Sequence, residues 1–539
     1  MLVLHKRHGD LIGDNRQAEL EPKSKERGSL RENADGMSTR RVRFRRHPRR
    51  LSSSPNRAPL KPEINTDWKN EDKICQPVAA GVTYSPNKGD YKMSSNANVH
   101  KVDQMLPLGQ MSLLGLQHVL AFYASGVAIP LIIGGAIGFT KEQIAILVAA
   151  DLFTCGIATL IQSLGFGNLI GIRLPVVLGC AFAPVGVMIS IGNTLGVTAI
   201  YGSIIGAAIF MLLMAPFFGK LLRFFPSVVT GSVVTIVGLT LIPVGFTDIG
   251  GGAGAANFGA PVNLLIAAFT MLVILFANRY FKGFMQSISI LIGLIVGTIV
   301  AGFFGMVDLT VVYEAKWFGV VRPFAFGLPT FNLEAILTMC VTMIVVMIES
   351  TGTFFVVGKF CDKEITDKDV VRGLRAEGFA SILGGIFNSF PYTTYSGNAG
   401  LVGLTKVASR YVVATAGVIL FCLGLLPKFA ALATIIPKPV LGAAMVIMFS
   451  MVATAGIEIL QKVDFSKNGN LLIAACSIGV GVGISVVPDL FSQTPGVIQI
   501  LFGESGIVLG SATAVLLNIF FNYGKEEEPA KQEPASETV

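Results

Sequence analysis

Long apolar segments separated by short polar loops fill the chain from about residue 105 onward. A helix needs about 20 apolar residues to cross the hydrocarbon core of a bilayer, and most of these segments reach that length. The pattern therefore predicts an all-α membrane protein with about fourteen transmembrane helices. The expected spans are 111–133, 143–163, 174–192, 195–217, 226–247, 260–278, 286–307, 334–357, 376–389, 391–404, 411–427, 438–457, 470–488 and 504–522.

Basic residues in the loops predict the orientation of the chain. If the N-terminus lies in the cytoplasm, the loops after even-numbered spans should carry most of the Lys and Arg. An even number of spans with both termini inside the plasma or inner membrane meets this rule, provided that the short segments 376–389 and 391–404 count separately. The basic residues of these loops are Arg173, Lys220, Arg223, Arg279, Lys282, Lys359, Lys363, Lys368, Arg372, Arg375, Lys406, Arg410, Lys462 and Lys467.

Polar segments flank the apolar region at both ends. Residues 1–104 are rich in Pro, Ser, Asn and charge, and residues 524–539 are rich in Glu and Lys. Such segments cannot bury enough apolar surface to fold, so we expect both to be disordered. The transmembrane domain is expected at 105–523.

Composition supports a membrane protein, and the net charge resides mainly in the N-terminal region. Charged residues make up 14% of the chain, against about 25% in soluble proteins. Residues 1–62 hold 16 Lys and Arg but 7 Asp and Glu, and the stretch from Arg40 to Arg50 is the densest part. We interpret this stretch as a cytoplasmic tail near anionic lipid rather than a nucleic-acid site. Translation starting at Met93 is an open alternative.

The third and tenth spans are interrupted at matching places in the two halves of the chain. The third opens with Gly171-Ile172-Arg173-Leu174-Pro175, and the tenth with Phe390-Pro391-Tyr392-Thr393-Thr394. In each, Pro and strand-forming residues precede a break of small residues. We expect a short strand followed by a half-helix whose free amides face the middle of the membrane, within two inverted seven-helix repeats.

Few ionisable side chains lie within the apolar segments. A carboxylate at the centre of a span costs about 2.5–3.5 kcal/mol, so each one suggests a function. Glu349 has nine uncharged residues on either side and is the best candidate, whereas Glu377 lies at the start of the predicted ninth span. For Asp151 a functional and a structural role stay equally open, whereas His118 is interpreted as structural, with a proton relay as the alternative.

Patterns typical of enzymes are missing from the sequence. There is no HExxH motif, no P-loop and no CxxC spacing among the seven Cys residues. We therefore expect no enzyme activity, no metal and no cofactor, and coupling to an ion gradient rather than to ATP.

Several long motifs resemble the nucleobase–ascorbate transporter family, also called xanthine/uracil permeases, and within it the bacterial uric acid and xanthine permeases. The resemblance covers about residues 106–521. It rests on Gln117-His118, GIRLPVVLGCAF, GSVVTIVGLTLIPVG, IESTGTFF and RAEGFASILGGIFNSFPYTTYSGNAGLVGLTKVASR.

The resemblance implies a core domain of spans 1–4 and 8–11, a gate domain of spans 5–7 and 12–14, and a homodimer. It also implies proton-coupled symport of a purine such as uric acid or xanthine. Residues that match the family's substrate-binding positions are Glu349, Phe182, Ser396, Gly397 and Asn398, and Glu377 matches the acidic residue tied to proton coupling.

Two positions bear on the substrate. Thr353 stands where uracil permeases place His, which favours purines. Gly397 replaces the family's Gln or Glu, so one edge of a purine would lose a side-chain partner, and we expect weaker binding and looser selectivity. Transport of uracil or another small anion is the alternative, and a membrane receptor or enzyme is a more distant one.

Residues 1–92 are expected to be dispensable for transport, because they show no apolar periodicity. A chain that begins at Met93 should reach the membrane and take up substrate at the rate of the full chain. Normal surface expression combined with lost uptake would contradict this expectation.

Overall fold

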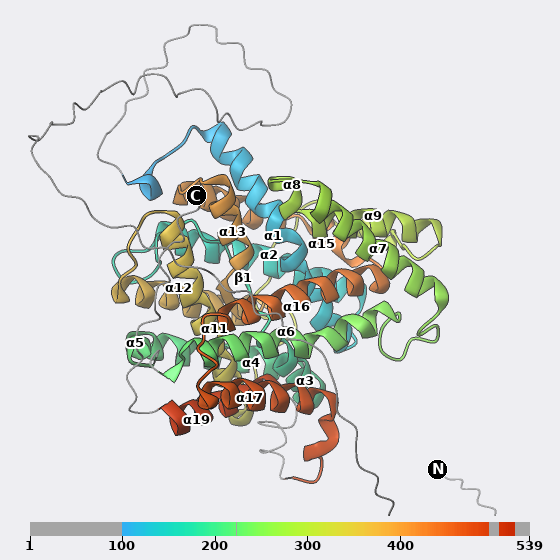
Figure 1. Ribbon diagram of the computed structural model, residues 1–539. Coiled ribbons are helices and arrows are strands. Elements are labelled where there is room, and N and C mark those ends of the chain that lie inside the picture. Colours follow the sequence, from blue (N-terminus) through green and yellow to red (C-terminus); the bar gives the residue numbers. More distant parts are fainter. Residues whose placement is uncertain (1–99, 222–223, 495–505, 523–539) are drawn as a thin grey trace, which may run out of the picture. The chain divides into compact units, whose positions relative to one another are not determined.

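The computed structural model of the chain describes residues 100–221, 224–494 and 506–522 (Figure 1). The described residues all belong to one unit, which begins at Met93. The predictions for residues 1–99 and 524–539 lie outside the described residues. The Arg-rich stretch and the alternative start at Met93 are among them.

The described part is mostly helical. In chain order its elements are η1 Lys101–Asp103, α1 Leu108–Ala136, α2 Lys141–Leu164, β1 Leu178–Cys180, α3 Val185–Leu195, α4 Val197–Met214, η2 Ala215–Phe217, α5 Phe218–Leu221, α6 Ser227–Ile249, α7 Pro261–Tyr280, α8 Phe284–Ser287, α9 Ser289–Phe303, α10 Thr310–Glu314, α11 Leu333–Phe360, α12 Asp367–Phe387, β2 Tyr392–Thr394, α13 Ser396–Thr405, α14 Arg410–Gly424, α15 Pro427–Thr434, α16 Lys438–Leu460, α17 Asn468–Val486, η4 Pro488–Phe491 and α19 Gly506–Asn522.

Eight helices in the described ranges are long and apolar enough to cross a membrane, or nine if α14 and α15 form one bent span. The shorter apolar helices α3, α9 and α19 also lie on predicted spans. The prediction of a helical, multi-pass membrane protein is therefore confirmed at this level.

The predicted ninth span was wrong at its start. It was placed at 376–389, but α12 begins at Asp367, where Thr366 and Asp369 form a reciprocal capping box. The first turns of α12 carry charged residues, which lowered the mean hydropathy and hid the helix. Glu377 consequently lies in the middle of a 21-residue helix rather than at its end.

Two other boundaries differ from the prediction. Helix α15 was not expected, and it follows α14 after a bend of 83°. Residues 100–104, assigned to the disordered region, pack on the helical unit instead. Lys101 pairs with Asp362, Asp103 pairs with Arg410, and Val102 is buried.

The two predicted short strands are present and pair with each other. β1 and β2 run antiparallel, with Leu178 opposite Thr394, Gly179 opposite Thr393 and Cys180 opposite Tyr392. All six residues are buried. Each strand leads into a short helix, β1 into α3 and β2 into α13, so the predicted order of strand and half-helix is confirmed at both places.

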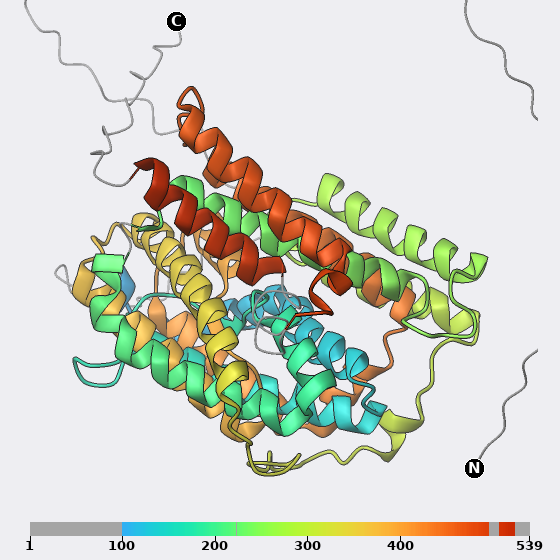
Figure 2. The same cartoon turned by 90° about the horizontal axis from the view of Figure 1, so that it is seen from below.

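The helices pack in two groups. The first helix group is α1, α2, α3, α4, α11, α12, α13, α14 and α15, together with the strands. The second helix group is α6, α7, α9, α16, α17 and α19. Figure 2 shows α17 and α19 beside α6 in the second group. The groups meet mainly where α1 and α11 contact α6, α9, α16 and α19.

Glycines allow α6 and α16 to approach closely. A Cβ on Gly238 would lie 2.3 Å from the amide nitrogen of Ala453, and one on Gly442 would lie 2.5 Å from the carbonyl oxygen of Gly245. A Cβ on Gly456 would lie 2.4 Å from the amide nitrogen of Thr235. Small residues at such contacts let helix backbones pack directly, which is the common basis of helix association in membranes.

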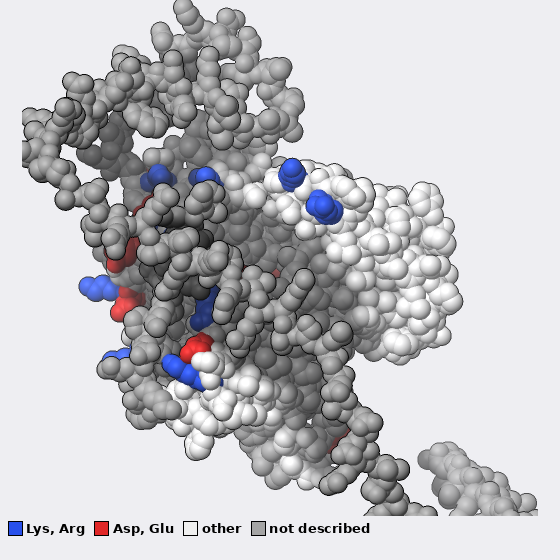
Figure 3. All heavy atoms as spheres, in the orientation of Figure 1, with Lys and Arg blue, Asp and Glu red and all other residues white. Residues whose placement is uncertain are grey.

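The surface of α7 and α9 is apolar. Leu265, Leu272 and Phe276 on α7 and Ile299 and Phe303 on α9 are exposed. Figure 3 shows an uncharged surface on the side where these helices lie, with basic residues near its upper rim. Such a face suits contact with lipid rather than water.

Gly238→Ala should destabilise the protein by about 1–3 kcal/mol, because the added methyl group would collide with the α16 backbone. Thermal unfolding in detergent measures the loss. Gly479→Ala on α17 is the matched control, since nothing lies within 4 Å of its Cβ position. Equal melting temperatures for both variants would show that α6 and α16 do not pack this closely.

Candidate substrate-binding site

The paired strands hold two half-helices so that both begin beside the pairing. The amide of Tyr395 donates to Val177 O at 2.9 Å, and the amide of Ala181 donates to Pro391 O at 2.9 Å, which extends the ladder past both strands. α13 starts directly after Tyr395, and α3 starts after Pro184. The first amides of a helix have no partner within the helix, so both starts can donate hydrogen bonds to a bound molecule.

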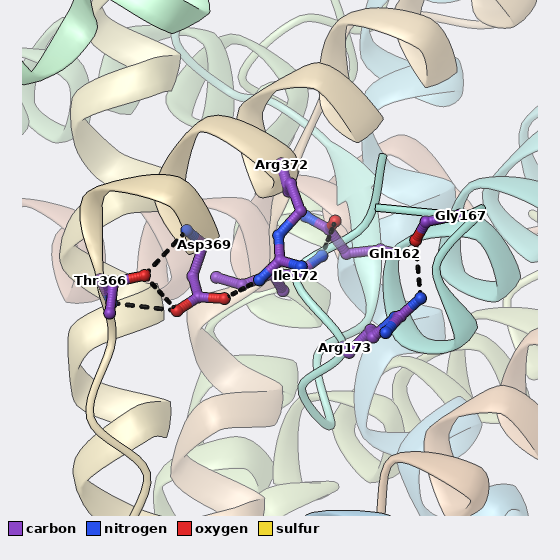
Figure 4. Close-up of polar contacts among 7 residues, drawn as sticks. All are labelled: Gln162, Gly167, Ile172, Arg173, Thr366, Asp369 and Arg372. Carbon is purple, nitrogen blue, oxygen red and sulfur yellow. Dashed lines mark hydrogen bonds and ion pairs between the residues drawn. The ribbon is translucent and has the colours of Figure 1, made fainter. Parts of the chain in front are cut away.

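A network outside the strands positions the segment that leads into β1. Gln162 on α2 accepts from the amide of Ile172 and, through its own carbonyl, from the amide of Arg173. The amide of Gly171 donates to Arg372 O on α12 at 2.9 Å. Figure 4 shows Gln162, Ile172 and Arg173, with Arg372 paired to Asp369 and Arg173 donating to Gly167 O. The GIRLP motif is therefore fixed to α2 and α12.

Glu349 lies on α11 and is partly exposed. Its carboxylate has no hydrogen-bond or ion-pair partner among the described residues, although α11 contacts both β2 and α13. Gly352, one turn further along α11, is exposed, as are Ser396 and Gly397 at the start of α13. The Glu349 carboxylate on α11 is thus an available acceptor, and the first backbone amides of α13 are available donors, on two helices that contact each other.

Phe182 follows β1 and is partly exposed. Its ring contacts the ring of Phe449 on α16 edge to face, with centroids 5.5 Å apart and an interplanar angle of 87°. Among the described residues, no aromatic ring stacks on Phe182. The contact also joins the first helix group to the second.

Glu377 is fully buried on α12, and it reaches β2. Its Oε1 accepts from the hydroxyl of Thr394 at 2.7 Å, while Oε2 has no partner within the described ranges. Ser350, next to Glu349 on α11, bonds the Thr393 hydroxyl at 2.8 Å and accepts from the amide of Thr394 at 3.2 Å. β2 therefore connects the helix of Glu349 to the side chain of Glu377.

Asn398 and His118 are both buried. Asn398 is in the first turn of α13, and neither atom of its amide group has a partner in the described part of the chain. His118 on α1 is 3% exposed, and its Nδ1 is likewise without a partner there. No hydrogen bond joins His118 to the other predicted site residues that the structure describes, so the structure does not bring it into the group.

Sequence reasoning missed a polar cluster around Asp151. Its Oδ1 accepts from the Cys180 thiol at 2.7 Å, the Ser389 hydroxyl at 2.9 Å and the Tyr392 hydroxyl at 3.0 Å. The cluster ties α2 to β1 and β2. The sequence shows an aspartate within an apolar span, but nothing in the sequence identifies the three side chains that bond to it.

Known proteins agree with the motifs and the fold. The model of the Permease family matches residues 109–490. The nucleobase transporter PlUacP of Paenibacillus larvae is 53% identical over 415 residues, covering 77% of this chain and 95% of the relative. The uric acid permease PucK of Bacillus subtilis is 51% identical over 412 residues, covering 76% and 95%. The xanthine permease of Bacillus subtilis is 49% identical over 425 residues, covering 79% and 97%.

Solved structures agree in fold. The transmembrane domain of the cyanobacterial bicarbonate transporter BicA has a TM-score of 0.52 at 16% identity, covering 73% of this chain and 99% of that one. Murine Slc26a9, an anion transporter in the inward-facing state, has a TM-score of 0.53 at 13% identity, covering 78% and 70%.

The apolar helices and the match to permeases define a multi-pass membrane transporter rather than an enzyme. The chain belongs to the Permease family, and its relatives in sequence include uric acid and xanthine permeases.

Tyr392→Phe should cost about 1–3 kcal/mol of stability, because it removes a donor to the buried Asp151 and leaves that carboxylate less satisfied. Tyr313→Phe, a change at an exposed residue of α10, is the control. Thermal unfolding of the two purified variants tests this. An unchanged melting temperature for Tyr392→Phe would mean that the cluster is not important for stability.

Proposed function

We propose that the protein is a secondary active transporter that takes up a purine nucleobase, such as uric acid or xanthine, together with protons. The observation that carries this proposal is the partly exposed carboxylate of Glu349, which has no partner among the described residues and lies on a helix, α11, that contacts both β2 and α13. A purine edge presents N–H donors and carbonyl acceptors side by side. A carboxylate can accept from the donors, and helix-start amides can donate to the acceptors.

Each predicted site residue then has a role. Glu349 accepts hydrogen bonds from the base, Phe182 stacks on its ring, and the backbone of Ser396 and Gly397 donates to another edge. Asn398 supports the start of α13 and reaches the base with small movements of the helix, which would also give its unpaired amide group a partner.

Glu377 is the proposed site of proton coupling. Its carboxyl group is bonded to Thr394 of β2, and Ser350, next to Glu349 on α11, is bonded to the same strand. Two carboxylates at this depth repel each other, so a proton on one makes the charge on the other less costly. The Thr394 hydroxyl bonded to Glu377 belongs to the strand that leads into α13, which links proton binding to the substrate-binding backbone.

The wider architecture is proposed as about fourteen spans in two inverted repeats of seven. The first helix group corresponds to the proposed core domain of spans 1–4 and 8–11, and the second to the gate domain of spans 5–7 and 12–14. The contacts within each group support this division. A homodimer in the cell membrane with both termini in the cytoplasm completes the proposal.

Transport of uracil or a small anion is the second candidate, since the similar folds of BicA and Slc26a9 belong to a bicarbonate and an anion transporter. An unpaired carboxylate at the proposed site disfavours a simple anion, because like charges repel. The high identity to uric acid and xanthine permeases supports a purine.

Cells that produce the chain should accumulate radiolabelled xanthine or urate more than uracil, and a protonophore should abolish the accumulation. Glu349→Gln should raise the KM by about tenfold or more, because the substrate loses a charged acceptor. Glu364→Gln, in the exposed loop before α12, is the control.

Surface expression has to be equal for the three proteins. Wild-type uptake by Glu349→Gln would exclude this residue as the anchor. Accumulation that persists with the protonophore would exclude proton coupling, and preference for uracil would support the second candidate.

A further inference from the structure

The ring of Tyr395 occupies the space beside Gly397. A Cβ on Gly397 would lie 2.7 Å from Cε1 and Cζ of Tyr395 and 2.8 Å from its hydroxyl oxygen. Gly397 has an ordinary helical backbone, so the reason for glycine here is space rather than backbone angle. The hydroxyl end of Tyr395 therefore stands where a side chain at position 397 would begin.

The backbone and the ring of Tyr395 are both held in place. Its amide donates to Val177 O at 2.9 Å, and its carbonyl accepts from the amide of Asn398 at 3.2 Å. Its ring meets the ring of Phe122 edge to face, with centroids 5.4 Å apart. Phe122 in turn packs on Gly179 of β1, where a Cβ would lie only 2.4 Å from the ring.

The hydroxyl group of Tyr395 has one partner among the described residues. Its oxygen lies 2.7 Å from Oγ of Ser125 on α1, and either group can be the donor. Ser125 is 6% exposed and also contacts the sulfur of Met448 on α16. A phenol can make one donated and two accepted hydrogen bonds, so at least one is left for another molecule.

We propose that the Tyr395 hydroxyl, oriented by Ser125, forms the hydrogen bond to the purine edge that Gly397 leaves without a side-chain partner, and so determines which purines are accepted. This inference rests on the proposed function. Tyr395 is partly exposed, and its hydroxyl oxygen lies 2.8 Å from the Cβ position of Gly397, an exposed residue at the start of α13. The Tyr395 hydroxyl can donate or accept a hydrogen bond. It can therefore take the place of a Gln side chain at position 397, whose amide group can also donate and accept.

The proposal changes the expectation for Gly397. The missing side chain does not by itself weaken binding, because Tyr395 fills its place with a polar group. A larger residue at 397 would push the hydroxyl away from Ser125 and from the substrate. Gly397→Ala should therefore act like the loss of the hydroxyl.

The experiment compares wild type with Tyr395→Phe, which keeps the ring against Phe122 and removes only the hydroxyl. Uptake of radiolabelled xanthine is measured in competition with hypoxanthine and urate, which differ from xanthine in their carbonyl groups. We expect the apparent affinity to fall by about tenfold for at least one purine, and by less than about twofold for one that lacks the contacted group. Tyr280→Phe, on the exposed surface of α7, is the matched control.

Two further variants separate recognition from structure. Ser125→Ala should change selectivity in the same direction as Tyr395→Phe. Gly397→Ala should do so as well, and the combination of Gly397→Ala with Tyr395→Phe should change selectivity no further than either alone. Additive effects, or an equal loss of affinity for all three purines, would overturn the proposal.

An active Tyr395→Phe variant with wild-type selectivity would also overturn it and leave the proposed function intact. Failure of the wild type to take up any purine would overturn both. If Tyr395→Phe does not reach the membrane, the selectivity of Ser125→Ala decides the question in the same way.

Discussion

The pairing of two three-residue strands is the constraint on which the rest of the site depends. Backbone amides and carbonyls away from water must be hydrogen-bonded, so an interrupted helix in a membrane is tolerated only where another segment satisfies it. Here the two interruptions supply each other's hydrogen-bond partners. β1 and β2 come from distant parts of the chain, and their backbones bond to each other in register. The positions of Phe182, Tyr395 and the two half-helices all follow from this pairing.

The three buried or partly buried acids in this region have different surroundings, which suggests different tasks. Asp151 has three donors on one oxygen, which join α2 to both strands, whereas its other oxygen has no partner among the described residues. Oε1 of Glu377 accepts from the Thr394 hydroxyl of β2, and its Oε2 has no partner among the described residues. The Glu349 carboxylate has no partner among the described residues. Among the described residues, the number of side-chain hydrogen bonds that the protein donates to these acids thus falls from three at Asp151 to none at Glu349.

Local patterns predicted the strands and half-helices well, because Pro175, Pro391 and the following small residues mark breaks that no continuous span would contain. The same patterns failed at the first turns of α12, where charged residues lower the hydropathy of a helical segment. They also failed at α15, which follows a sharp bend after α14. The partners of Asp151 and the place of the Tyr395 ring beside Gly397 depend on contacts between distant segments, which spacing along the chain does not encode.

The packing of residues 100–104 has a practical consequence for following motion. Their ion pairs with Asp362 and Arg410 fasten the start of the described chain to the first helix group, whereas α19, at its end, belongs to the second. A fluorophore joined just before His100 and another joined just after Asn522 would therefore report on different groups. Energy transfer between them would follow a displacement of one group against the other during a transport cycle, without a label inside the membrane.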